Sequence, residues 1–179
     1  RGRSRRTKKA AQNSIAGGGE LPSQHPLLEY LADKNRMLST LPQSEVDAIT
    51  MFLSGKYHDV FGDALLTNDA LMGLVKSAKV LRFLDDDDKQ VIYQAGEATS
   101  VFTLVLDGSV KVQAGADGFD STCGPWTVFG MRALRQRTPI IADWTAVVEQ
   151  AAPEDHGARL LQIELTQYLE CVVSDAGVG

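Results

Sequence analysis

The alternation of apolar side chains in residues 101–112 constrains the fold more than any other feature of the sequence. Phe102, Leu104 and Leu106 recur at every second position, which is the period of a β-strand. Asp107-Gly108 interrupts the run before the alternation resumes. An Asp-Gly pair between two alternating runs predicts a tight β-hairpin, because glycine adopts the positive φ that the turn requires.

The remaining pattern predicts helices before this hairpin and short strands around it. The expected helices cover residues 25–31, a segment from Pro42 to Gly55 with Thr40 as its cap, a segment capped by Thr67 or Asn68, and one opening at Thr166. The expected strands cover residues 90–94, 126–129, 145–149 and 159–164, with loops at 115–125 and 151–157. This order predicts an α+β fold: an antiparallel, jelly-roll-like β-barrel flanked by N-terminal helices and a C-terminal helix.

The net charge of −5 divides unevenly along the chain. Six of the 18 basic residues and none of the 23 acidic residues lie in residues 1–19, so a +6 arm precedes a −11 body. We interpret residues 1–24 as a flexible basic, glycine-rich linker. The arm has no aromatic residues on which bases would stack, so we do not expect nucleic-acid binding. A linker near an anionic membrane surface and a plain linker both stay open.

Features that the sequence lacks argue against a membrane-spanning protein and a disulfide-stabilised protein. No apolar run approaches the roughly 20 residues that a membrane-crossing helix needs. Cys123 and Cys171 are the only cysteines, which favours free thiols in a reducing compartment over a disulfide framework. Because the chain does not begin with Met, we expect it to be part of a longer protein.

The titratable residues do not form a recognisable catalytic or metal-binding pattern. His25, His58 and His156 are scattered singly, without the spacing of zinc ligands. The run Asp85–Asp88 is interpreted as a solvated turn, because four consecutive carboxylates cannot all converge on one ion. Walker loops and nucleophile-elbow motifs are absent. We therefore expect no catalytic residue, no metal and no cofactor.

A further motif is the sequence Phe129-Gly130-Met131-Arg132-Ala133-Leu134. With Gln94-Ala95-Gly96-Glu97 and the expected hairpin, it resembles the cyclic-nucleotide-binding fold over roughly residues 80–170. In that fold the six-residue motif is the phosphate-binding cassette, written Phe-Gly-Glu-x-Ala-Leu. The resemblance implies a pocket that holds the ribose and the phosphate of a cyclic nucleotide.

Two positions of the expected nucleotide pocket depart from the family pattern, one in this cassette and one after it. Met131 stands where the family has the Glu that accepts the ribose 2′-hydroxyl, and a thioether is a weak acceptor. The phosphate-binding Arg position falls near Ala142-Asp143, where a carboxylate would repel a phosphate, although Arg135 and Arg137 are available in the loop. Each lost charge-assisted bond is worth roughly 1.5–3 kcal/mol. We expect a degenerate pocket, with a genuine cAMP- or cGMP-binding module as the alternative.

One branch of the fold matches better, because it already lacks the cassette Glu. Over about residues 40–172 the chain resembles the C-terminal cyclic-nucleotide-binding homology domain of the cyclin M (CNNM, CorC-like) magnesium transport mediators. The matching segments are Leu41–Gln43, Phe52–Ser54, Leu71–Val75, Val91–Gly96, Gly108–Val112, Trp126–Leu134, Asp143–Ala146, Leu160–Ile163 and Thr166–Leu169.

This resemblance implies a non-catalytic regulatory and dimerisation domain of a magnesium or other divalent-cation transport protein. Its implied bounds are residues 25–174, with a helical part (25–79), a β-roll (80–174) and a tail (175–179). The implied partners are a second copy of the chain and upstream CBS and transmembrane domains, so the domain would lie at the cytosolic face of a membrane and touch the membrane only through the missing part of the chain.

The apolar faces of the first two expected helices offer more surface than a small barrel can cover. We expect these faces to contribute dimer contacts, and their packing on the barrel itself is the alternative. The candidate contacts are Leu27, Leu28, Leu31, Val46, Ile49 and Leu53.

Overall fold

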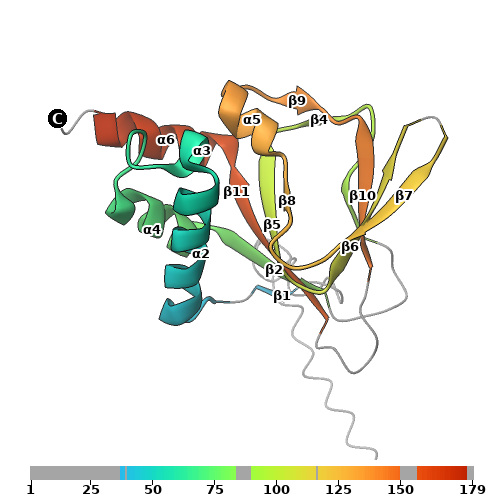
Figure 1. Ribbon diagram of the computed structural model, residues 1–179, viewed down its shortest axis with the longest axis horizontal. Helices are drawn as coiled ribbons and strands as arrows, with labels where there is room; N and C mark the ends of the chain where they lie inside the picture. Colours follow the sequence, from blue (N-terminus) through green and yellow to red (C-terminus); the bar gives the residue numbers. More distant parts are fainter. Residues whose placement is uncertain (1–36, 39, 84–89, 116, 150–156, 177–179) are drawn as a thin grey trace, which may run out of the picture.

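The computed structural model describes residues 37–38, 40–83, 90–115, 117–149 and 157–176. Within these ranges a central sheet lies between a layer of helices and a second sheet (Figure 1). The strand order is β1-β2-β11-β5-β8 in the first sheet and β3-β10-β6-β7 in the second, and β4 pairs with β9 beside them. Leu27, Leu28, Leu31 and Asp85–Asp88 lie outside the described residues.

Short helices and strands make up these layers. The helices are α2 (Gln43–Lys56), α3 (His58–Phe61), α4 (Asn68–Ser77), α5 (Met131–Gln136) and α6 (Leu165–Ala176). The strands are β1 (Met37–Leu38), β2 (Lys79–Phe83), β3 (Gln90–Tyr93), β4 (Ala98–Thr99), β5 (Val101–Asp107), β6 (Ser109–Ala114), β7 (Phe119–Cys123), β8 (Val128–Phe129), β9 (Ile140–Ile141), β10 (Trp144–Glu149) and β11 (Ala158–Glu164).

The described strands confirm the jelly-roll-like α+β class, with two differences. The two sheets face each other, but their hydrogen-bonded ladders do not close into a barrel within the described residues. Strand β7 lies inside residues 115–125, for which the sequence predicts a loop. Its sequence, Phe-Asp-Ser-Thr-Cys, is mainly polar and carries no apolar alternation, so only its pairing with β6 reveals it as a strand.

Strand β5 is buried on both faces, and its alternate side chains fill two different cores. Phe102 and Leu104 face the helices and pack in a cluster that includes α2, α4 and α6. Val105 faces the second sheet and packs in a cluster that includes β10. All three side chains are fully excluded from solvent. The period of two therefore holds, but both sets of positions are buried.

The Asp107-Gly108 turn is a corner between the two sheets, so the predicted hairpin is wrong. Strand β5 pairs with β11 and β8, whereas β6 pairs with β10 and β7. Gly108 has the expected positive φ of +79°, and a Cβ there would lie 2.7 Å from the Cβ of Ala158. The predicted positive φ of the glycine is confirmed. Because β11 lies close to Gly108, the chain continues from this turn into the other sheet.

Helix α2 covers the central sheet instead of offering an apolar face to a second chain. Val46, Ile49 and Leu53 are at most 2% exposed within one chain. They pack in the helix-side core, so their assignment as dimer contacts is wrong and the alternative, packing on the chain's own sheet, holds. The helix is capped by Pro42 rather than Thr40, without a side-chain capping bond.

The predicted cap of α4 is confirmed. Thr67 is the N-cap, and its hydroxyl accepts a hydrogen bond from the backbone N–H of Ala70 at 3.1 Å. A threonine at this position satisfies one of the unpaired donors of the first helical turn. The helix then buries Leu71, Leu74 and Val75.

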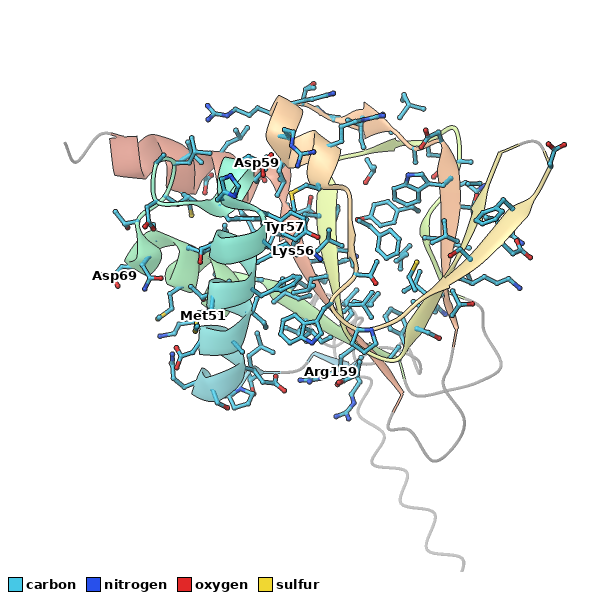
Figure 2. All side chains as sticks on the ribbon, in the orientation of Figure 1. Met51, Lys56, Tyr57, Asp59, Asp69 and Arg159 are labelled. Carbon is cyan, nitrogen blue, oxygen red and sulfur yellow. The ribbon has the colours of Figure 1, made fainter. Side chains whose placement is uncertain are left out.

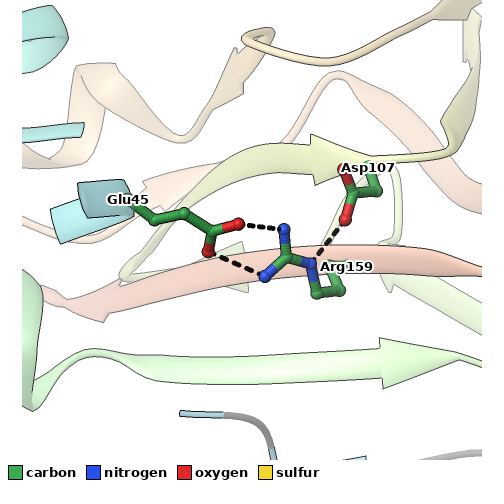
Figure 3. Close-up of polar contacts among 3 residues, drawn as sticks. All are labelled: Glu45, Asp107 and Arg159. Atoms are coloured by element: carbon green, nitrogen blue, oxygen red, sulfur yellow. Dashed lines mark hydrogen bonds and ion pairs between the residues drawn. The ribbon is translucent and has the colours of Figure 1, made fainter. Parts of the chain in front are cut away.

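An ion-pair cluster joins the start of α2 to the central sheet (Figure 3), and Figure 2 labels its arginine, Arg159. The guanidinium of Arg159 on β11 donates two hydrogen bonds of 2.8 Å to the carboxylate of Glu45. Its Nε donates to Asp107 at 2.5 Å. The bidentate pair fixes both the distance and the orientation of the two groups. Arg159 therefore connects the helical layer with the corner where β5 ends.

We expect Gly108→Ala to destabilise the domain more than Gly115→Ala. The two glycines have similar φ values of +79° and +76°. Both substitutions therefore lower the free energy of unfolding by roughly 1–2 kcal/mol, because alanine disfavours the left-handed conformation. A methyl group at Gly115 meets no atom within 4 Å, whereas one at Gly108 meets Ala158. The overpacking at this contact destabilises Gly108→Ala by roughly a further 1–3 kcal/mol.

Urea unfolding of the two variants measures this difference. Equal free energies of unfolding for Gly108→Ala and Gly115→Ala would contradict the packing of the corner against Ala158.

Candidate functional site

A cavity of about 410 Å³ opens between the two sheets, on the side where β7 and β8 form their edges. Val112 on β6, with Ser121 and Cys123 on β7, forms one wall. The segment 128–132, from β8 into α5, forms the opposite wall. The cavity therefore brings part of the predicted cassette together with residues of the second sheet that the sequence did not indicate.

The cassette begins with a turn that only glycine fits. Gly130 precedes α5 with a φ of +74°. A Cβ there would lie 2.1 Å from the carbonyl oxygen of Val101 and 3.1 Å from the hydroxyl of Tyr93. The close approach holds the first turn of α5 against β5. Phe129 is therefore the last residue of a strand, and residues 131–134 form a helix that the sequence analysis did not predict.

The middle of the cassette is a packing surface with one exposed charge. Met131 is 9% exposed, and its side chain belongs to the helix-side core together with Leu134. Ala133 is fully buried. Arg132 is exposed and donates a hydrogen bond of 3.3 Å to the carbonyl of Ile141. Because an ionised carboxylate in place of Met131 would have to be desolvated, a thioether suits this position better than Glu.

Asp143 lies on the wall of the cavity. The family resemblance predicts the phosphate-binding cation near Ala142-Asp143. The neighbouring Ala142 is 2% exposed. Its backbone exchanges hydrogen bonds with the turn before β4: Gly96 N–H donates to Ala142 O at 2.7 Å, and Ala142 N–H donates to Glu97 O at 3.0 Å. The chain is therefore fixed at this point, with a carboxylate next to the opening.

Arg135 and Arg137, which the sequence offers as alternative phosphate-binding cations, lie at the end of α5 and do not line the cavity. Arg135 donates from Nε to the Asp59 carboxylate on α3 at 2.6 Å, and this hydrogen bond lowers the pKa of Asp59. Arg137 ends α5 with a φ of +56°. Neither residue lines the cavity. Arg132 is the one basic side chain on its described wall.

Two aromatic rings line the cavity, and a third packs behind them. Trp144 packs against Tyr93 with 4.6 Å between ring centroids and against Phe129 with 5.6 Å. Trp144 and Phe129 line the cavity, and Tyr93 lies behind them in the core between the sheets. The sequence could not reveal this group, because its members come from β3, β8 and β10.

A chain of hydrogen bonds holds Tyr93 in place beneath the cavity. Its hydroxyl lies 2.7 Å from Val101 O and 2.7 Å from the Thr103 hydroxyl. Gln162 Nε2 donates to the same Thr103 oxygen at 3.3 Å. If Thr103 donates to Tyr93 and Tyr93 donates to Val101, each hydroxyl is satisfied. Thr103 is fully buried and therefore needs these partners.

The described residues offer no metal centre of ordinary composition. In the described ranges, no three His, Cys, Asp or Glu side chains gather closely enough to hold a metal ion. Among the described helices, none is long and apolar enough to cross a membrane.

A protein-family model matches most of the chain. The model described as "Metal transporter CNNM2-like, C-terminal CNBH domain" matches residues 32–173. The match includes every described helix and strand except the end of α6.

Solved structures show the same fold at low sequence identity. A cyclic-nucleotide-binding domain from Methylobacillus flagellatus is 11% identical, with a TM-score of 0.56, covering 81% of this chain and 75% of that one. The sensor domain of the transcriptional regulator DNR from Pseudomonas aeruginosa is 17% identical, with a TM-score of 0.47, covering 70% and 81% respectively. The first likeness shows a cyclic-nucleotide-binding-like fold.

Tyr93→Phe is expected to make the stability of the domain less sensitive to alkaline pH. Burial raises the pKa of Tyr93, so folding favours the un-ionised phenol. That stabilisation is complete below the pKa of an unfolded tyrosine, about 10, and is lost as the pH rises above it. The variant should also lose about 1–3 kcal/mol at neutral pH, because Val101 and Thr103 lose a buried partner.

Urea unfolding at neutral pH and at a series of pH values above 10 measures both effects. Tyr57→Phe, at a partly exposed tyrosine, serves as the control. An equal loss of stability by the native protein and Tyr93→Phe above a pH of about 10 would contradict this account. It would show that ionisation of Tyr93 does not contribute to alkaline unfolding.

Proposed function

Because the chain belongs to the family of CNNM2-like metal-transporter C-terminal CNBH domains, we propose that it is a non-catalytic regulatory module of a magnesium or other divalent-cation transport protein. Its cavity does not bind cyclic nucleotides. The observation that carries this second statement is the position of Asp143 on the cavity wall, where a phosphate would need a cation.

The charges of the wall support the proposal. Arg132 and Asp143 are both exposed and carry opposite charges, so together they give an anion no net attraction. Met131 supplies only a weak acceptor for a ribose hydroxyl. A cyclic nucleotide would thus lose two charge-assisted bonds of roughly 1.5–3 kcal/mol each. A loss of this size weakens binding by at least about a hundredfold.

The composition of the wall also supports a non-catalytic role. Its titratable side chains are Cys123, Arg132 and Asp143, and its described residues include no histidine. Within the described structure these three side chains share no hydrogen bond, so the wall lacks a nucleophile activated by a base. In this proposal the domain acts through its contacts rather than through chemistry.

The proposed partners are a second copy of the chain and the CBS and transmembrane domains of the same protein. The domain would lie at the cytosolic face of the membrane that holds those domains, with residues 1–24 as the connection. Exposed apolar side chains are available for contacts with these partners: Met51, on α2, is 75% exposed, and Ile141, on β9, is 58% exposed. The interface must use such residues rather than the buried face of α2.

A genuine cyclic-nucleotide module is the alternative. It is favoured by the volume of the cavity, which lies within the roughly 300–1,000 Å³ of ligand sites, and by the basic side chain of Arg132 on its wall.

Asp143→Arg is expected to create cyclic-nucleotide binding that the native chain lacks. The change replaces a repelling carboxylate with a guanidinium that is suited to phosphate. Calorimetric titration with cAMP and with cGMP should show no saturable binding to the native chain and affinity at least tenfold stronger in the variant. Asp120→Arg is the matched control. It makes the same change of charge on β7, at a residue that does not line the cavity.

Saturable micromolar binding of cAMP or cGMP to the native chain would contradict the proposal and support the alternative. Equal binding by Asp143→Arg and Asp120→Arg would show that the general charge, and not the cavity wall, attracts the nucleotide.

Static light scattering tests the proposed homodimer independently of the cavity. We expect twice the chain's 19.4 kDa at high micromolar concentration, because exposed apolar side chains such as Met51 are buried on association. A monomer mass throughout this range would remove dimerisation from the proposal and leave the rest intact.

A further inference from the structure

We propose that the cavity between the two sheets binds a small, uncharged, mainly aromatic molecule. The inference goes beyond the regulatory function above, which requires only that cyclic nucleotides do not bind. It rests on three properties of the cavity: its walls, its charges and its opening.

The inner walls are apolar and aromatic. Val112, Val128 and Ile140 provide aliphatic surface, and the rings of Phe129 and Trp144 provide two aromatic faces or edges. These rings are braced against each other at a centroid distance of 5.6 Å. A flat apolar molecule can therefore pack against rigid rings and remove apolar surface from water on both sides.

The charged side chains disfavour an ionic ligand. Arg132 and Asp143 are the charged residues of the described wall, and their charges are opposite. Arg132 already donates to Ile141 O. An anion approaching Arg132 also approaches the carboxylate of Asp143, and a charged group inside would exchange water for apolar walls. An uncharged molecule avoids both costs.

The opening admits a ligand without unfolding of the sheets. The cavity lies between edge strands, β7 of the second sheet and β8 of the first. Phe119, at the start of β7, is 71% exposed while lining the cavity. An exposed aromatic side chain at the mouth can close over a bound molecule and bury its own surface.

Two fluorescent probes of the same skeleton test the proposal on the full chain. N-phenyl-1-naphthylamine is uncharged, and 1-anilinonaphthalene-8-sulfonate carries one sulfonate. We expect saturable binding of one uncharged probe per chain, with affinity at least tenfold stronger than that of the sulfonate. Asp143→Asn should strengthen binding of the sulfonate severalfold and leave the uncharged probe unchanged, because it removes only the repelling charge.

A pair of variants on β7 locates the probe. Ser121 lines the cavity, whereas its neighbour Thr122 is exposed and does not line it. Ser121→Phe should reduce affinity for the uncharged probe at least tenfold by filling the cavity, and Thr122→Phe should not change it. Thermal unfolding confirms that both variants are folded.

Protection of a cysteine provides a measurement that does not depend on a cavity-filling substitution. Cys123 lines the cavity and is partly exposed. In a Cys171→Ser background, saturating uncharged probe should slow alkylation of Cys123 by iodoacetamide at least fivefold. Unchanged alkylation would place the probe elsewhere and overturn the proposal.

Other results overturn the proposal as well. The absence of saturable binding, or equal binding by Ser121→Phe and the native chain, excludes the cavity as the site. Binding that appears only on dilution to monomers, or only after deletion of residues 1–36, shows that protein occupies the cavity instead. None of these outcomes affects the cyclic-nucleotide titration, so the two proposals fail separately.

Discussion

The burial of β5 on both faces is the constraint on which the rest of the structure depends. Its alternate side chains fill two cores, with Phe102 and Leu104 against the helices and Val105 against the second sheet. A strand in this position cannot turn back beside itself, because β11 and β8 already pair with its two edges. The chain therefore turns at Gly108 into the second sheet, and two facing sheets follow from one central strand.

The shape of the cavity follows from the same strand. Val101 O at the start of β5 accepts from Tyr93 and lies against Gly130, which allows α5 to begin close to the sheet. These contacts involve backbone and aromatic packing, and none of them requires a charge. The fold can thus hold a cavity of this shape independently of the charges on its wall, which here include Arg132 and Asp143. This independence of shape and charge is the physical basis of our proposal that the pocket does not bind cyclic nucleotides.

The sequence predicted the features that depend on local chemistry. The cap at Thr67, the positive φ at Gly108, most strands and the jelly-roll-like class are confirmed. The sequence-based predictions were wrong where a segment distant in the sequence determines the local structure. The hairpin is a corner because β11 passes close to Gly108, and Val46 lies in the core because the central sheet covers it. Strand β7 has polar residues and is a strand only through β6, and the rings beneath the cavity meet only after folding.

The central proposal is that the domain has a cavity in a cyclic-nucleotide-binding-like fold but does not bind cyclic nucleotides there. Amide chemical shifts of ¹⁵N-labelled chain during titration with cAMP test this claim directly, because Gly130 and Met131 report on the cassette itself. We expect these shifts to stay unchanged up to millimolar cAMP. Saturable shifts centred on Gly130 and Met131 at micromolar cAMP would contradict the claim.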